Sequence, residues 1–499
     1  MMRTFIKSAG LILAWAAVQP VCAFSLWGPL EAWQTATMDY GNRYYYLNVE
    51  EDTGIGVSEN GGSKNFGEGS RLTTPIVTYA FDPTFLEYFG TKGVAAVDSA
   101  MKLLNGLPSA SSANLNKFLT DGNEQFNYSA QAMSLLDMKS VVMWLMLEHM
   151  GLLGETHVWD LRTRIPYGTV PCNFDYFVIN RSFDPVTYNP SSYVNGRNYA
   201  YSIWDGCTAG IQVADAIETA ADATQPRFTA VATPEGLQLG GFYLNVTRDD
   251  MGGLKYLYRK SNYANQGLDT DATATPFSSL ISSWEPAVSN APITTVAGTF
   301  AGLVGGVEKV TFVKVPYDSV LGTAFSNRVF TYKIPWITNS TLRRLTVTRT
   351  VVAPDVLFTA ADLVVNAFPP NDEAVTRSGN FIANNVVSAG GGITPSTIAA
   401  PMVITFNKVG AIYYNVNPGF LDPYNFEMYP IFIWGSFDGS TNAPVVFPVG
   451  SSIEQLEQQV LQGGAAVPAG TWNPISLTNT TGTATGGGTG GGGGGTTGG

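Results

Sequence analysis

The sequence predicts an α+β fold in its first part, then a mostly antiparallel β-sandwich, then a disordered glycine-rich tail. Three observations indicate this order. Segments with helical apolar spacing lie in the first half of the chain. Strand-like runs separated by turn residues fill much of 293–477. Residues 478–499 contain only Thr, Asn, Ala and Gly, which cannot bury enough apolar area to fold.

Residues 1–23 have the features of a secretory signal peptide. Arg3 and Lys7 supply a positive start, 9–18 is a short apolar core, and Val-Cys-Ala at 21–23 ends in a small residue. A membrane anchor is the alternative, but a spanning helix needs roughly 18 uncharged apolar residues, and neither this run nor any later segment reaches that length. We therefore expect a secreted protein, extracellular or at the cell surface, with no membrane span in the mature chain.

Composition narrows the range of partners. Charged residues make up 13% of the 499-residue chain, whereas about 25% is typical of soluble proteins. The formal charge is −12, and nucleic-acid binding needs clustered Lys and Arg, so we expect no nucleic-acid partner. An extracellular protein or self-assembly is the expected type of partner. The length predicts more than one domain.

Two cysteines, Cys172 and Cys207, remain once the predicted leader and Cys22 are removed. Exported chains meet oxidising conditions, and two thiols with none left over favour one disulfide. Closing a loop of this size contributes about 3–4 kcal/mol in the chain-entropy model. The alternative is a pair of free, buried thiols.

The first half contains the helical signals. Residues 24–71 are aromatic and glycine-rich and are interpreted as an N-terminal extended segment. Residues 74–81 are β-prone, and 93–104 have the apolar spacing of an amphipathic helix. A second helix is predicted over 129–153, and because its middle is apolar nearly all round, we expect it to be buried on most sides.

A third helix is predicted to begin near Thr247. The Thr247 hydroxyl can cap the exposed amides, and Asp249 and Asp250 are favourably placed against the helix dipole. Residues 264–292 are rich in Ser, Thr, Ala, Asn and Asp and are predicted to form a linker. The expected β-sandwich, 293–477, contains five strand-like runs: 310–315, 344–352, 402–409, 411–416 and 431–437.

Three blocks, in this order, resemble the matrixin and astacin side of the metzincin zinc peptidases. The first is the strand 76–81 with the helix that follows it. The second, 137–152 (DMKSVVMWLMLEHMGL), is similar to the family's Asp-Leu-x-x-Val-Ala-x-His-Glu-x-Gly-His-x-Leu-Gly-Leu. The third, 249–258 (DDMGGLKYLY), is similar to its closing helix, Asp-Asp-Ile-x-Gly-Ile-Gln-x-Leu-Tyr. The resemblance covers about 72–263 and implies a zincin-like domain there.

The chemistry of that family does not carry over. A His-Glu-x-x-His helix presents two imidazoles one turn apart with a glutamate that activates zinc-bound water. This chain has Trp144, Leu145 and Glu148 at those positions, and its only histidines are His149 and His157. Trp144 has no lone pair for a metal and Leu145 cannot act as a base. The degenerate site therefore predicts no catalytic residue, no metal and no cofactor.

Weaker alternatives remain open. Glu148, Glu155 and His157 could form a residual metal site, although acids and imidazoles often lie near a helix end without one. Asp249 and Asp250 could be calcium ligands, but helix capping explains them better. A carboxylate pair of the kind that glycosidases use cannot be recognised without geometry.

Three functions follow from these observations. The first is a secreted, non-catalytic protein with a structural, surface or adhesive role, built on a degenerate metallopeptidase-like domain. The second is a carboxylate-based hydrolase acting in a cleft between domains. The third is a peptide-binding module that uses the former substrate groove, with strand 76–81 as the edge that pairs with the peptide.

Overall fold

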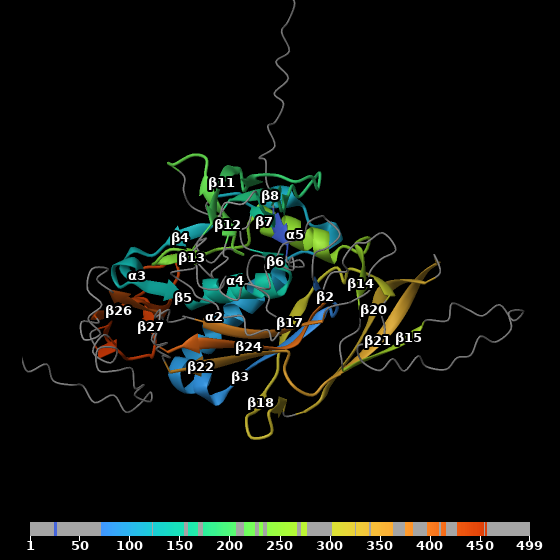
Figure 1. Cartoon of the computed structure of the whole chain (residues 1–499). Helices are drawn as coiled ribbons and strands as arrows, with labels where there is room; N and C mark the ends of the chain where they lie inside the picture. Colours follow the sequence, from blue (N-terminus) through green and yellow to red (C-terminus); the bar gives the residue numbers. More distant parts are fainter. Residues whose placement is uncertain are drawn as a thin grey trace, which may run out of the picture.

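The computed structural model describes much of the chain, in segments. These are 24–26, 71–121, 123–153, 158–167, 173–205, 214–224, 229–232, 237–266, 271–276, 302–324, 326–338, 341–362, 375–382, 397–408, 411–415, 427–453 and 455–456. Helices and several sheets together give an α+β protein, as predicted (Figure 1). The predicted signal peptide 1–23, both cysteines of the predicted disulfide and the tail 478–499 lie outside the described residues.

A central sheet joins strands from both halves of the chain (Figure 1). Strand β3 pairs in parallel with a strand on each side, with Val77 opposite Phe312 and Tyr79 opposite Val356. The sheet runs β17 (Thr311–Lys314), β3 (Ile76–Phe81), β22 (Val356–Ala361) and β24 (Thr397–Asn407), which are parallel; β2 (Arg71–Leu72) and the antiparallel β23 (Val375–Ile382) both pair with β24.

This pairing corrects the predicted arrangement of the second half. We expected the strands of 293–477 to form a separate, mostly antiparallel sandwich, yet β17 and β22 flank β3 and run parallel to it. The predicted boundary at 264–292 therefore does not divide two independent sheets. β3 is buried along nearly its whole length, as is typical of an interior parallel strand covered on both faces. Its partners lie far away in the chain, so local sequence patterns do not indicate them.

Helix α2 (Pro83–Gly106) covers one face of the central sheet. It begins ten residues before the predicted 93–104 segment, with Asp82 accepting a hydrogen bond from the Phe85 amide and Pro83 in the first turn. The helix bends at Gly90, whose φ of 56° and ψ of −158° are not helical. Phe85 and other aromatic rings of α2 pack on rings of β22 and β24 and so form the centre of the main core.

The second predicted helix is interrupted. Instead of one helix over 129–153 there are α3 (Tyr128–Ala132), then β5 (Leu135–Asp137), then α4 (Met138–His149). Ser134 has a φ of 53°, which ends the first turn, and β5 pairs in parallel with β26 (Glu427–Ser436). The apolar run could not indicate this break, because a buried strand and a buried helix look alike over a few residues.

Helix α5 (Arg248–Tyr258) confirms the third predicted helix, including its cap. Thr247 accepts a hydrogen bond from the Asp250 amide, and the Asp250 carboxylate accepts one from the Thr247 amide, which is a capping box. Beside α5 lies a short three-stranded antiparallel sheet. Its middle strand is β1 (Phe24–Leu26), between β6 (Leu152–Leu153) and β9 (Ser182–Phe183).

A second, antiparallel sheet extends to one side of the body (Figure 1). Its apolar side chains, among them Val304, Leu345 and Val347, form a small separate core. Two of its strands include residues of the predicted linker 264–292, so part of that segment is structured by pairing. The order is β14 (Tyr263–Gln266), β16 (Gly302–Gly305), β20 (Arg328–Thr338), β21 (Thr341–Val351) and β15 (Ala272–Pro276).

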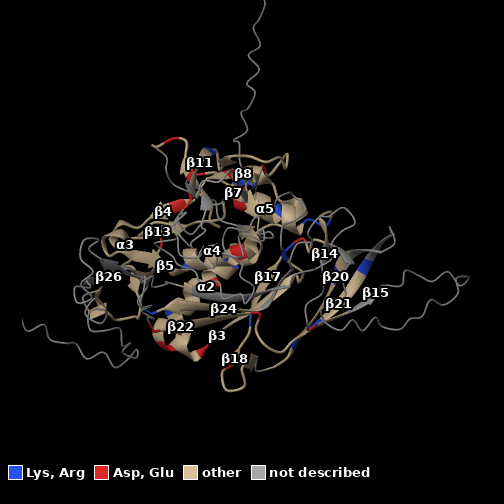
Figure 2. Ribbon diagram, in the orientation of Figure 1, with Lys and Arg blue, Asp and Glu red and all other residues tan. Residues whose placement is uncertain are grey.

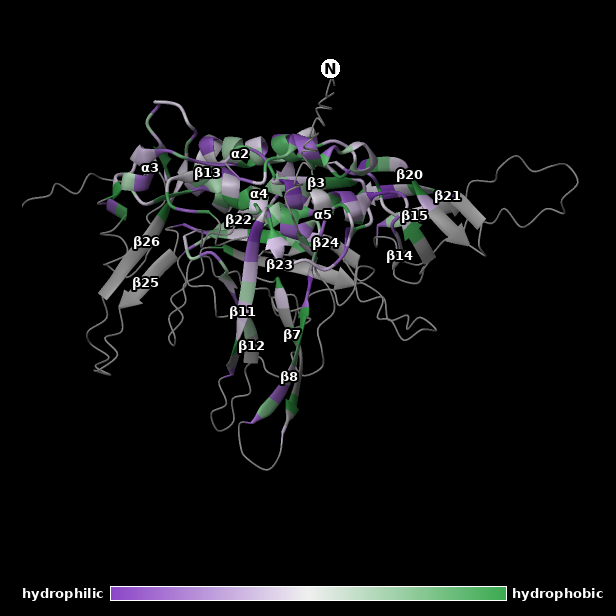
Figure 3. Ribbon diagram, turned by 90° about the horizontal axis from the view of Figure 1, so that it is seen from above, coloured by the Kyte–Doolittle hydropathy of each residue, from purple (hydrophilic) through white to green (hydrophobic). Residues whose placement is uncertain are grey.

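Two hairpins stand out from the body as one arm (Figure 3). They are β7 (Trp159–Pro166) with β8 (Phe174–Asn180), and β11 (Arg197–Asp205) with β12 (Ala214–Ala220). Leu161 and Ala216 are buried between them, so the arm has a small core of its own. Charged residues are few and scattered along the ribbon (Figure 2). Among the described residues, no helix is long and apolar enough to cross a membrane.

Candidate functional site

The degenerate zinc-site positions predicted from the sequence lie on α4. Asp137 caps this helix: its Oδ2 accepts hydrogen bonds from the Ser140 amide at 3.0 Å and from Ser140 Oγ at 2.6 Å. Ser140 Oγ in turn accepts a hydrogen bond from the Tyr243 amide at 2.8 Å, which ties the helix to β13 (Gly241–Tyr243). Burial raises the pKa of the Asp137 carboxyl to about 6.

The three degenerate zinc-site positions all face the interior. Trp144 is 3% exposed, Leu145 is fully buried and Glu148 is 6% exposed. Trp144 and Glu148 are four residues apart and so share one face of the helix. Trp144 and Leu145 belong to the main hydrophobic core, with residues of α2 and of the central sheet. The face that would hold a metal in the resembled family is therefore occupied by the buried side chains of Trp144 and Glu148, with Leu145 packed beside them.

His149 does not supply a metal ligand from Nδ1. This nitrogen lies 2.6 Å from the carbonyl oxygen of Leu145, one turn back along α4. A carbonyl oxygen can only accept, so Nδ1 carries the proton and has no lone pair for a metal. Within the described segments, no three His, Cys, Asp or Glu residues are grouped as a metal site, while Glu155 and His157 lie outside those segments.

The residues on α4 do not fit a catalytic zinc ion. An indole and an aliphatic chain stand where a ligand and a base are required, and the nearby imidazole is oriented by its own helix. We therefore derive no metal-dependent step for this helix.

The two acids at the start of α5 are structural. The Asp250 carboxylate accepts hydrogen bonds from the amides of Val231 and Ala232 at 3.0 and 3.1 Å, in addition to its bonds with Thr247. Asp249 Oδ2 accepts one from the Asn195 amide at 2.6 Å. Burial raises the pKa of Asp250. Both carboxylates join loops to a helix start. The capping box confirms capping for Asp250, whereas the Asp249 carboxylate bonds to the Asn195 loop.

The predicted peptide-binding edge is wrong. Strand β3 lies between β17, which pairs with residues 76–79, and β22, which pairs with 79–81, so in the described part of the chain it is an interior strand and not an edge. β17 is the outer neighbour on one side, and there the side chain of Asn105 bonds to the Phe312 backbone. A peptide has no open backbone to pair with at β3.

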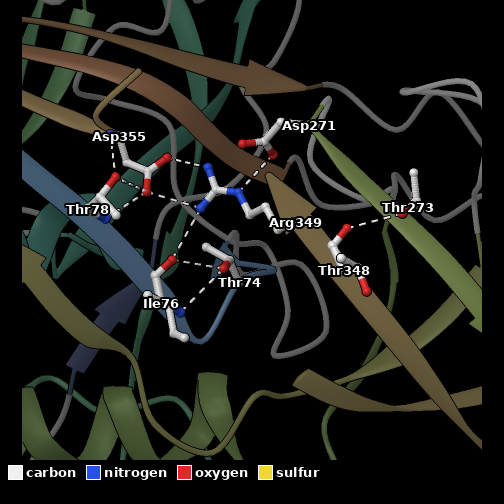
Figure 4. A network of polar contacts seen from close by, with 8 residues as sticks. All are labelled: Thr74, Ile76, Thr78, Asp271, Thr273, Thr348, Arg349 and Asp355. Atoms are coloured by element: carbon white, nitrogen blue, oxygen red, sulfur yellow. Dashed lines mark hydrogen bonds and ion pairs between the residues drawn. The ribbon is translucent and has the colours of Figure 1, made fainter. Parts of the chain in front are cut away.

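A buried ion pair that sequence reasoning missed connects the two large sheets (Figure 4). The Arg349 guanidinium on β21 donates to both carboxylate oxygens of Asp355, and both side chains are 3% exposed. Its Nε donates to Asp271 Oδ1 at 2.8 Å. Asp355 Oδ2 also accepts from the Thr78 amide at 2.7 Å. No motif marks these residues, because the partners come together only through sheet packing.

Arg71 is a second buried cation without a sequence signal. Its Nη1 donates to the carbonyl oxygens of Leu257 and Asn262 at 2.6 and 2.9 Å, and its Nη2 donates to that of Val304 at 2.7 Å. Burial lowers the pKa of this guanidinium to about 10. The bonds join the end of α5 to β16, so the role of Arg71 is to hold elements together.

The arm carries exposed apolar side chains on its β7–β8 hairpin. Ile165 on β7, Tyr167 directly after that strand and Phe177 on β8 are each more than half exposed. The two hairpins are joined by a hydrogen bond of 2.6 Å from Tyr176 Oη to Asp205 Oδ2. Cys172 and Cys207 lie outside the described residues, so their disulfide stays a prediction.

Comparison of the chain with known proteins gives no match. No protein family, no curated protein and no solved structure matches the chain.

Proposed function

We propose that this is a secreted, non-catalytic protein with a structural or adhesive role, in which residues 72–263 descend from a zincin-like domain. The observation that carries the proposal is the burial of Trp144 and Leu145 in the main core. A helix that holds a catalytic ion must leave one face open to substrate and water. Here that face contributes to stability instead. Export is supported by the leader-like sequence 1–23.

Three further buried carboxylates support the same conclusion. Asp355 is engaged by Arg349, and Asp249 and Asp250 are engaged by backbone amides and capping groups. A hydrolase that works with two acids needs both of them to face a substrate. These three are committed to holding loops, sheets and a helix start in place.

An adhesive rather than purely scaffolding role is favoured by the arm. Its two hairpins project from the body (Figure 3). The β7–β8 hairpin exposes Ile165, Tyr167 and Phe177. Grouped exposed apolar side chains on a soluble protein often mark interaction sites. This favours the arm over β3 as the place of contact, since β3 is paired on both sides.

Metal analysis and a peptidase assay test the proposal. The purified mature protein is dialysed against zinc, washed, and analysed by mass spectrometry for bound metal and with a mixed peptide library for cleavage. We expect neither stoichiometric zinc nor cleavage. One zinc per chain together with hydrolysis that a chelator removes would falsify the proposal. The Glu148→Gln variant is analysed in parallel, and a loss of bound metal in this variant would show that Glu148 on α4 is a ligand.

A further inference from the structure

The first three residues after the predicted leader form a buried strand. Phe24 is 4% exposed and Leu26 is fully buried. Strand β1 is the middle strand of its sheet, with Ser25 opposite Leu153 on one side and opposite Ser182 on the other. The hydroxyls of Ser25 and Ser182 are 2.7 Å apart and hydrogen-bonded. No residue of spacer separates the predicted cleavage point from this strand.

Helix α5 is shaped to receive that strand. Phe24 packs against the ring of Tyr256, with ring centres 6.1 Å apart. A Cβ added at Gly253 would lie 3.1 Å from the Phe24 ring and 2.5 Å from Leu152, so this glycine makes room for both side chains. Glycine in the middle of a helix weakens it. The sequence nevertheless has two adjacent glycines here, and the docked strand gives a physical reason for Gly253.

We propose that the Ala23–Phe24 bond is hydrolysed before β1 docks, so that the chain is exported unfolded and completes this part of its fold afterwards. The step consumes one water molecule, leaves the new carboxylate on Ala23 and the new amino group on Phe24, and uses a signal peptidase. A peptidase needs the residues on both sides of the bond extended and accessible. Once Phe24 lies between α5, β6 and β9, the residue after the bond is buried and paired.

The inference rests on the export part of the proposed function and adds the order of events. If the chain folds before export, the docked β1 protects the Ala23–Phe24 bond from the peptidase. A precursor that folds before export is then resistant to processing.

Cleavage of the purified full-length precursor tests this order. The precursor is incubated with a purified signal peptidase in detergent micelles, once folded and once freshly diluted from urea, and release of residues 1–23 is followed by mass spectrometry. We expect cleavage after Ala23 to be at least about tenfold slower for the folded precursor, because only the undocked fraction is cut. Equal rates would overturn the proposal.

Two glycine variants provide matched controls. Gly253→Leu improves helix propensity but fills the space of Phe24, whereas Gly106→Leu makes the same change where no atom lies within 4 Å. We expect Gly253→Leu to raise the cleavage rate of the folded precursor toward its unfolded rate, and Gly106→Leu to leave it unchanged. The reverse result contradicts the proposal.

Leu26→Asp keeps the test decisive if Gly253→Leu does not fold. It places a charge at the buried end of β1 and leaves α5 intact, so it is expected to make the folded precursor cleavable. A precursor that is not cut after Ala23 even when unfolded shows that the export signal itself is wrong. Rapid cleavage of the folded wild type instead leaves export standing and rejects the order of events.

Discussion

Asn105 binds the backbone of Phe312 as a neighbouring strand would. Its Nδ2 donates to the Phe312 carbonyl oxygen at 2.8 Å, and the Phe312 amide donates to its Oδ1 at 2.7 Å. Phe312 lies on β17, at the edge of the central sheet. The last turn of α2 therefore covers part of an edge that could otherwise pair with another chain.

Asn105→Ala is expected to lower the free energy of unfolding by about 2 kcal/mol, because two backbone groups of β17 lose their partner. We also expect more aggregation on warming, since the edge is exposed. Urea unfolding and light scattering measure the two effects. Lys102→Ala, at an exposed position of the same helix, is the control and is expected to change neither; similar behaviour of the two variants contradicts this role.

Asp355→Ala is expected to lower the free energy of unfolding by about 3–5 kcal/mol, because it leaves the Arg349 guanidinium buried without its main counter-charge. Urea unfolding followed by circular dichroism checks this. Lys314→Met breaks an ion pair with Asp98 whose side chains are 44% and 39% exposed, and is expected to cost less than about 1 kcal/mol. Equal losses would show that burial does not set the strength of the Arg349 pair.

The parts of this fold that sequence predicted are the local ones. Apolar spacing located β3 and much of α2, and the Thr247–Asp250 pattern located the start of α5. Each of these depends on residues within about one helical turn or a few strand positions. The burial of α4 was predicted for the same reason, since its apolar residues surround the helix.

The features that the sequence did not predict depend on residues that lie far apart in the chain. Thr78 and Asp355 are 277 residues apart, yet they are joined by hydrogen bonds inside one sheet region. Neither the parallel pairing of β3 nor the Arg349 pair leaves a local pattern, because sheet order is decided by packing of the whole core. The same reason explains why strand 76–81 was mistaken for an edge.

Lowering the pH is expected to favour the folded state through Asp137. The pKa of this carboxyl is about 6 in the fold and 3.8 as its ordinary value, because burial disfavours the charged form. The folded protein therefore takes up a proton between about pH 6 and pH 4 that the unfolded chain does not. The contribution of Asp137 to the free energy of unfolding rises as the pH falls, by about 2–3 kcal/mol.

Asp137→Asn tests this sign. Asparagine still caps a helix but does not titrate. The difference in unfolding free energy, wild type minus variant, is measured by urea unfolding at pH 7, 6, 5 and 4, and is expected to increase toward pH 4. Asp250 is present in both proteins, so its pH-dependent contribution to the unfolding free energy cancels in this difference. A difference that stays constant with pH rejects the raised pKa.

The disulfide between Cys172 and Cys207 stays a prediction, because both cysteines lie outside the described residues. Tyr176 and Asp205, which are hydrogen-bonded, lie four and two residues from these cysteines. We expect non-reduced mature protein to show no free thiol in native or unfolded form. Cys172→Ser is expected to lower the free energy of unfolding by about 3–4 kcal/mol under oxidising conditions, and by much less under reducing ones. Two titratable thiols in the unreduced, unfolded chain contradict the disulfide.

Leu145→Glu restores a carboxylate where the resembled peptidases have their base, and so asks whether that face of α4 is a cleft or a core. Because Leu145 is fully buried, we expect a loss of at least about 4 kcal/mol or failure to fold. Leu145→Ala, which keeps the position apolar, is expected to fold with a loss of about 2–5 kcal/mol. Leu86→Glu, at a 46% exposed position of α2, is expected to be tolerated. If Leu145→Glu is instead as stable as Leu86→Glu, that face of α4 is open to water and the helix is not part of the core.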